Sequence, residues 1–127
     1  MKKKEIILFF SCCLVIVFTS CTNDKADVIY PAPSCDTSFI SLDSNLTPIM
    51  EANCFRCHNA ENAPINGGNY NLEDLSTLQN AVSSGELISA IKQDNPLIPY
   101  MPQDGGKLSD CEINMFIRWK NEGVPDN

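Results

Sequence analysis

Cys54-Phe55-Arg56-Cys57-His58 is the stretch with the strongest pattern in this chain of 127 residues. Residues i and i+3 of a helix share a face, so Cys54 and Cys57 can both reach one edge of a bound group. His58 follows the second cysteine directly and is the only histidine in the chain. A CxxC pair alone fits a redox dithiol, half of a zinc site or a covalent cofactor site. The adjacent histidine decides among these three interpretations.

The CxxCH pattern predicts covalent attachment of one c-type haem. Each thiol would form a thioether with a vinyl group, and the imidazole of His58 would offer a nitrogen to the iron. A redox dithiol does not need the histidine. A structural zinc finger needs a second ligand pair at a suitable distance, and the remaining cysteines are scattered singly. The opposing interpretation is a buried, cysteine-rich turn that holds no cofactor.

The N-terminal segment, residues 1–20, has the pattern of an export signal. Three lysines precede an apolar run over 6–18, which is shorter than the about 20 residues of a membrane span. Thr19-Ser20 before Cys21 resembles a bacterial lipobox, in which Cys21 would be lipidated and become the first residue of the mature protein. An ordinary secreted protein and an uncleaved anchor are the alternatives. All three predict export, and c-type haem is attached to exported chains in bacteria.

The chain is acidic, with nine Lys and Arg against sixteen Asp and Glu and a formal net charge of −7. Removal of residues 1–20 takes away three lysines and one glutamate, so the mature charge becomes −9. Such a surface argues against nucleic acid as a partner and against direct adhesion to anionic lipid. It would suit a redox partner protein with a basic docking patch, although a solvated acidic surface without a partner fits as well.

The seven cysteines also indicate a disulfide. Cys12 and Cys13 lie in the signal segment, and the lipid and haem assignments use three others, which leaves Cys35 and Cys111. Two remaining thiols in an oxidising compartment predict a bond between them. The alternative is two separate buried thiols. The bond requires the two Cα atoms to lie within about 7 Å of each other.

The rest of the chain divides into a tether and one domain. Residues 21–34 are polar, contain two prolines and show no helical period, so we expect a tether between the lipid and the domain. A single small domain with a modest core should span residues 35–127. That region shows no alternation long enough to build a sheet. We therefore expect an all-α domain.

The helix signals of this domain begin at Thr47, which can cap a helix that has Pro48 at its first position. This helix should carry the two attachment cysteines. Asn71 should cap a short second helix, and a third should cover 86–92. The segment 95–106 is rich in proline and glycine and should be irregular.

The last helix has the clearest boundaries. Ser109 and Glu112 form a capping box at its start. Gly123 followed by Pro125 should end it. Its apolar face needs a partner, and the helix that carries Cys54 is the natural candidate.

A six-coordinate haem iron needs a second axial ligand opposite His58, and methionine is the expected choice where no second histidine exists. Met50 lies one turn before Cys54, on the helix that already supplies the proximal side. Met115 lies on the apolar face of the last helix, where a methionine usually serves packing. Met101 lies in a proline-stiffened loop, 43 residues after His58. We therefore predict Met101 as the ligand. The alternative is a loop methionine beside a five-coordinate iron.

The order of signal segment, helix, CxxCH, loop, short helices, Met-Pro and terminal helix with a tryptophan resembles the small single-haem class I cytochrome c family. It is similar, more narrowly, to cytochrome c domains carried on bacterial outer-membrane lipoproteins. The resemblance covers about residues 35–124 and implies crossed first and last helices, with short helices and loops around one haem. It also implies His58 and Met101 as axial ligands, and a backbone carbonyl near Pro64 that accepts the His58 ring N–H.

The expected function is one-electron transfer, because a His/Met-ligated iron has no open position for a substrate. Methionine ligation raises the haem potential, which suits a carrier in a respiratory chain rather than a low-potential reductant. We expect the carrier to be exported and lipid-anchored to a bacterial membrane, the outer membrane being favoured, with its domain in the periplasm or at the cell surface. The alternatives are a haem enzyme or gas sensor with an open sixth position, and an accessory lipoprotein with structural haem.

Overall fold

The computed structural model describes residues 35–127. The expected signal segment, the lipidation site Cys21 and the tether 21–34 lie outside the described residues. The described part is all-α, since it contains helices and no strand. Within it, no helix combines the length and the apolar character that a membrane span requires.

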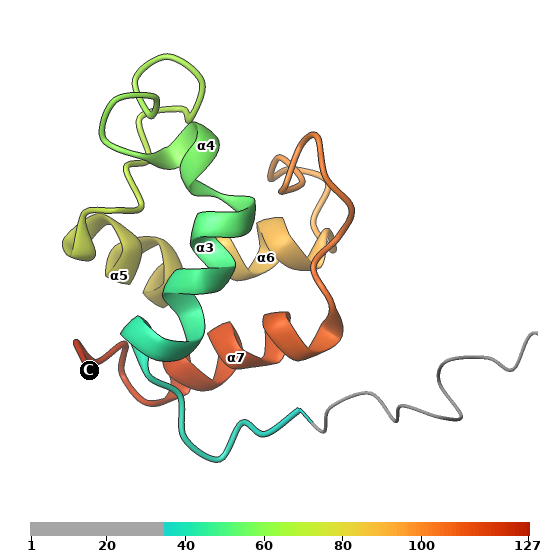
Figure 1. Ribbon diagram of the computed structural model, residues 1–127. Helices are drawn as coiled ribbons and strands as arrows, with labels where there is room; N and C mark the ends of the chain where they lie inside the picture. Colours follow the sequence, from blue (N-terminus) through green and yellow to red (C-terminus); the bar gives the residue numbers. More distant parts are fainter. Residues whose placement is uncertain (1–34) are drawn as a thin grey trace, which may run out of the picture. The chain divides into compact units, whose positions relative to one another are not determined.

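The helical elements of the described residues follow one another along the chain as shown in Figure 1. They are η1 (Leu42–Leu46), α3 (Thr47–Asn53), α4 (Phe55–His58), α5 (Leu75–Ser84), α6 (Glu86–Lys92) and α7 (Asp110–Asn121). The π-helical turn η1, α3 and α4 form one nearly continuous column, and α7 runs across the foot of this column. α7 contacts η1, α5 and α6.

The first column begins one turn earlier than the sequence predicts. Ser41 is its N-cap, and the Ser41 hydroxyl accepts the Ser44 N–H at 3.3 Å. Pro48 lies in the first turn of α3, as expected. The prediction that Thr47 caps this helix is wrong, because Thr47 already has helical backbone angles, φ −56° and ψ −46°, and an N-cap needs an extended backbone. Its hydroxyl donates instead to the Leu42 carbonyl at 3.1 Å.

The second predicted cap is also displaced. The carboxylate of Asp74, not Asn71, caps α5 by accepting the Thr77 N–H at 2.8 Å. The Asn71 side chain accepts the Glu73 N–H at 3.1 Å and closes a turn before the helix. The Leu72 N–H donates to the His58 carbonyl of the CxxCH motif, so this segment is bonded to the motif before α5 begins. By contrast, α6 covers the predicted residues 86–92.

The last helix agrees with the sequence at both ends. Ser109 and Glu112 make both bonds of a capping box. Gly123 has φ 86°, and its N–H donates to the Lys120 carbonyl at 3.0 Å. The next N–H, of Val124, donates to the Trp119 carbonyl at 3.0 Å, which completes a Schellman motif.

The core is built on the apolar face of α7. Phe116 and Trp119 are buried, and the Trp119 indole N–H donates to the Pro125 carbonyl at 2.9 Å. Around them pack residues from the other elements: Ile40, Leu46, Met50, Leu78, Val82 and Ile91. The expected contact with the Cys54 helix is made chiefly at η1, the start of the same column.

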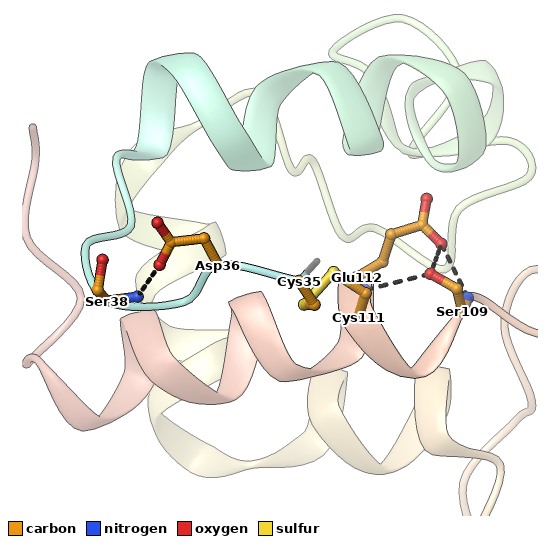
Figure 2. Close-up of a disulfide and its surroundings, with 6 residues drawn as sticks. All are labelled: Cys35, Asp36, Ser38, Ser109, Cys111 and Glu112. Atoms are coloured by element: carbon orange, nitrogen blue, oxygen red, sulfur yellow. Dashed lines mark hydrogen bonds between the residues drawn. A yellow bond between two sulfur atoms is a disulfide. The ribbon is translucent and has the colours of Figure 1, made fainter. Parts of the chain in front are cut away.

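A disulfide joins Cys35 to Cys111, and Figure 2 shows it beside the capping box of α7. The two Cα atoms lie 5.5 Å apart, within the limit that the pairing requires. Cys35 is exposed and Cys111 is half-buried in the first turn of α7. The bond therefore fastens the segment that leads into η1 to the start of the last helix.

Candidate functional site

A cavity of about 370 Å³ lies among the helices, and it is lined by three of the four predicted cofactor residues: Cys54, His58 and Met101. Cys57 is half-buried on α4 but does not line the cavity. Most of the wall is apolar and comes from α5, α6, α7 and the segment before α5: Leu72, Ala81, Leu87, Ala90, Ile91 and Phe116. A volume of this size lies within the range of small-molecule and cofactor sites.

Cys54 lies at the break between α3 and α4. Its carbonyl accepts the N–H groups of Cys57 at 3.1 Å and of His58 at 2.9 Å, so one tight turn carries the whole motif. Neither Cys54 nor Cys57 forms a disulfide. Burial raises the pKa of the Cys54 thiol to about 11. A reactive redox dithiol needs the opposite shift, because the thiolate is its nucleophile.

The ring of His58 is held by a backbone carbonyl. Nδ1 lies 3.0 Å from the Tyr70 carbonyl oxygen. A carbonyl can only accept, so Nδ1 carries the proton and Nε2 keeps a free lone pair for a metal. The His58 carbonyl accepts the Leu72 N–H at 2.8 Å. The segment after α4 therefore orients the histidine through two bonds.

The expectation that a carbonyl near Pro64 accepts the His58 ring N–H is wrong. The chain makes turns through residues 59–67, in which the Ala63 carbonyl accepts the Gly67 N–H at 3.1 Å. It then reverses where Gly68 and Asn69 both have positive φ, 59° and 66°. Only after this reversal does the backbone return to the histidine, which makes Tyr70 the acceptor.

Gly67 is buried against the attachment motif, where a side chain has no room. A Cβ atom on it would lie 2.5 Å from the Cys57 carbonyl oxygen and 3.0 Å from His58 Nδ1. We expect Gly67→Ala to lower the free energy of unfolding by about 2 kcal/mol, a typical cost of overpacking, and to weaken the hold on His58. Gly106→Ala is the matched control, because a Cβ there meets nothing within 4 Å. Urea unfolding of both variants checks this, and equal stability would contradict the close packing described.

Met101 approaches the cavity from the segment between α6 and α7, which Figure 1 draws in orange across from α4. Its side chain is half-buried. Met50 also lines the cavity, but from α3, and is only 2% exposed within the core. Met115 packs partly buried against the core and does not line the cavity. Of the three methionines, Met101 is the one that enters from a loop.

Two contacts that brace the site have no signal in the sequence. The Tyr70 hydroxyl donates to the Glu86 carboxylate at 2.8 Å, and this bond raises the pKa of the Tyr70 phenol. It ties the segment after α4 to the start of α6. An ion pair between Arg56 and Asp104 joins the CxxCH motif to the segment of Met101. Each pair brings together residues distant along the chain, so spacing alone cannot reveal it.

No family model, curated protein or solved structure matches this chain. Within residues 35–127, no group of three or more His, Cys, Asp or Glu side chains is placed to hold a metal ion. The donors around the cavity are instead one imidazole and one thioether, with a thiol beside them. An apolar cavity with this donor set fits a haem, which brings four of its own nitrogen ligands to the iron.

Proposed function

We propose that this protein is an exported, membrane-tethered electron carrier with a cytochrome c-like fold and one covalently attached haem. Cys54 and Cys57 would form the thioethers, and His58 and Met101 would be the axial ligands. The observation that supports this most is that Met101, predicted separately from the CxxCH motif, lines the same cavity as Cys54 and His58. A haem bound there would supply reversible one-electron chemistry at its iron.

The surrounding residues have the properties that this task needs. The Tyr70 carbonyl keeps the proton of His58 on Nδ1, so Nε2 is available as a ligand. The apolar walls from α5, α6 and α7 would cover much of a bound haem, which would limit the reorganisation of water around a changing charge. The thioether of Met101 would favour a higher reduction potential. With both axial positions taken by the chain, no position is left for a substrate.

The setting of the carrier is part of the same proposal. Lipidation at Cys21 would hold the domain at a bacterial membrane, with residues 21–34 as the tether. The charge of −9 on the chain without residues 1–20 would suit a redox partner whose docking patch is basic. A Cys21→Ser variant that leaves the membrane fraction would agree with the lipid anchor, whereas one that stays there with an uncleaved N-terminus would indicate a signal anchor.

The test of the proposed function is the Met101→Ala variant, purified from a strain that attaches haem. In the wild-type protein we expect a sulfur-to-iron charge-transfer band near the red end of the oxidised spectrum. Met101→Ala should lose this band, lower the reduction potential and let the reduced protein bind CO, because the sixth position opens.

Met115→Ala is the control for that experiment, since Met115 does not line the cavity. It should keep the band and the potential of the wild-type protein. A wild-type protein that binds CO rapidly would favour a haem enzyme or gas sensor. A Met101→Ala variant with an unchanged spectrum and potential would contradict the ligand assignment.

A further inference from the structure

Gln93 ends α6 in a backbone conformation that glutamine rarely adopts. It is the C-cap, with φ 57° and ψ 37°, in the left-handed region where glycine is favoured. Its own N–H donates to the Ser89 carbonyl at 2.9 Å, and a glycine could make that bond equally well. The cap therefore does not explain the glutamine. A residue kept in a strained conformation points to a use for its side chain.

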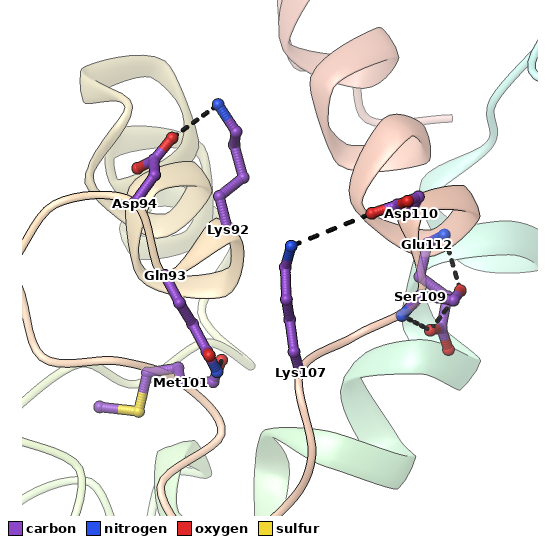
Figure 3. Close-up of polar contacts among 8 residues, drawn as sticks. All are labelled: Lys92, Gln93, Asp94, Met101, Lys107, Ser109, Asp110 and Glu112. Atoms are coloured by element: carbon purple, nitrogen blue, oxygen red, sulfur yellow. Dashed lines mark hydrogen bonds and ion pairs between the residues drawn. The ribbon is translucent and has the colours of Figure 1, made fainter.

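The side chain of Gln93 reaches the backbone of Met101. Its Nε2 donates to the Met101 carbonyl at 3.3 Å, while the Met101 N–H donates to the Ala90 carbonyl at 3.1 Å. Both backbone polar groups of Met101 are thus bonded to the last turn of α6. Figure 3 shows Gln93 directed toward Met101, whereas its neighbours Lys92 and Asp94 pair with each other, at 2.6 Å.

The segment around Met101 has few other attachments. Leu97 is 90% exposed and Tyr100 is 45% exposed, so these two side chains anchor it little. The ion pair of Asp104 with Arg56 joins two exposed side chains. Such pairs contribute little to stability, and salt weakens them further. The bonds to α6 are consequently the main polar constraint on where the Met101 backbone lies.

We propose that Gln93 is the positioning residue for the sixth ligand. By fixing the Met101 carbonyl, the Gln93 amide keeps the thioether in the cavity, where it would stay bound to a haem iron for longer. This inference rests on the proposed haem ligation and adds to it the residue that controls how firmly the methionine is held.

The decisive variant is Gln93→Gly in the full-length protein with haem attached. Loss of one hydrogen bond should raise, about fivefold, the fraction of molecules in which the Met101 sulfur is not bound to the iron. The rate of CO binding by the reduced protein and the hydrogen exchange of the Met101 amide should both rise by that factor. The midpoint of thermal unfolding should stay within about 4 °C of wild type. Glycine adopts the left-handed conformation without strain, and this gain offsets the lost hydrogen bond.

Two further variants separate positioning from general stability. Gln93→Glu keeps the size and the backbone strain but removes the N–H donor, so it should show the same fivefold rise. Lys92→Gln changes an adjacent exposed residue that does not contact Met101, and it should behave as wild type.

The outcomes are distinguishable from failure of the proposed function. If the wild-type protein lacks the sulfur-to-iron band, the haem ligation itself is wrong. Suppose instead that the wild-type protein has the band. If Gln93→Gly and Gln93→Glu then bind CO at the wild-type rate and exchange the Met101 amide at the wild-type rate, the positioning role is wrong. A rise in both variants, with Lys92→Gln unchanged, supports it.

Discussion

Cys54→Ala and Cys57→Ala are each expected to give a poorly folded chain that does not retain haem. Each variant would remove one of the two proposed thioethers, so the haem would be held less firmly during folding. Without haem, the apolar walls of the cavity of about 370 Å³ would face water, which costs roughly 25 cal/mol per Å² of apolar surface. Such a loss matters in a domain, because a typical domain is stable by only about 5–15 kcal/mol. We therefore expect haem to be part of the core as well as the reactive group.

Mass spectrometry of the denatured wild-type chain should show the mass of one added haem, because thioethers survive denaturation. The single-alanine variants should show little of that mass and should unfold at lower urea concentrations than the wild type. Arg56→Lys, which alters an exposed residue between the two cysteines, should retain its haem. Free thiols at Cys54 and Cys57 in the wild-type protein would contradict covalent attachment of haem.

The double variant Cys35→Ser/Cys111→Ser should lose about 4.5 kcal/mol of unfolding free energy. The chain-entropy relation gives this value for a bond that spans 76 residues, because the open chain gains many conformations when it unfolds. Haem content should not change, since neither residue lines the cavity. Changing both cysteines together avoids leaving one thiol free to form other bonds.

Urea unfolding of the double variant, beside wild type with and without a reductant, measures this effect. Reduction of the wild-type protein should lower its stability to that of the double variant. Alkylation of Cys35 and Cys111 without reductant would show that the protein has two thiols instead. A double variant as stable as the oxidised wild type would show that the bond contributes nothing to stability.

Several features could be predicted from the sequence because their causes lie within a few residues. The capping box of Ser109 and Glu112 and the turn at Gly123 need only neighbours in the same helix. The bounds of α6 were likewise predicted, since its apolar residues recur at the helical period. The caps at Thr47 and Asn71 were wrong, because both residues make other hydrogen bonds in the folded chain.

The chemical groups of the candidate site can be read from the residues alone: the CxxCH motif with the single histidine, a loop methionine and two remaining cysteines. Their surroundings depend on how the whole chain folds. It selected Tyr70 as the acceptor for His58, placed Gly67 against the motif and bonded Met101 to α6 through Gln93. The physical reason is that these contacts join segments distant along the chain. Packing of the whole domain determines such contacts, so the spacing of residues along the chain does not predict them.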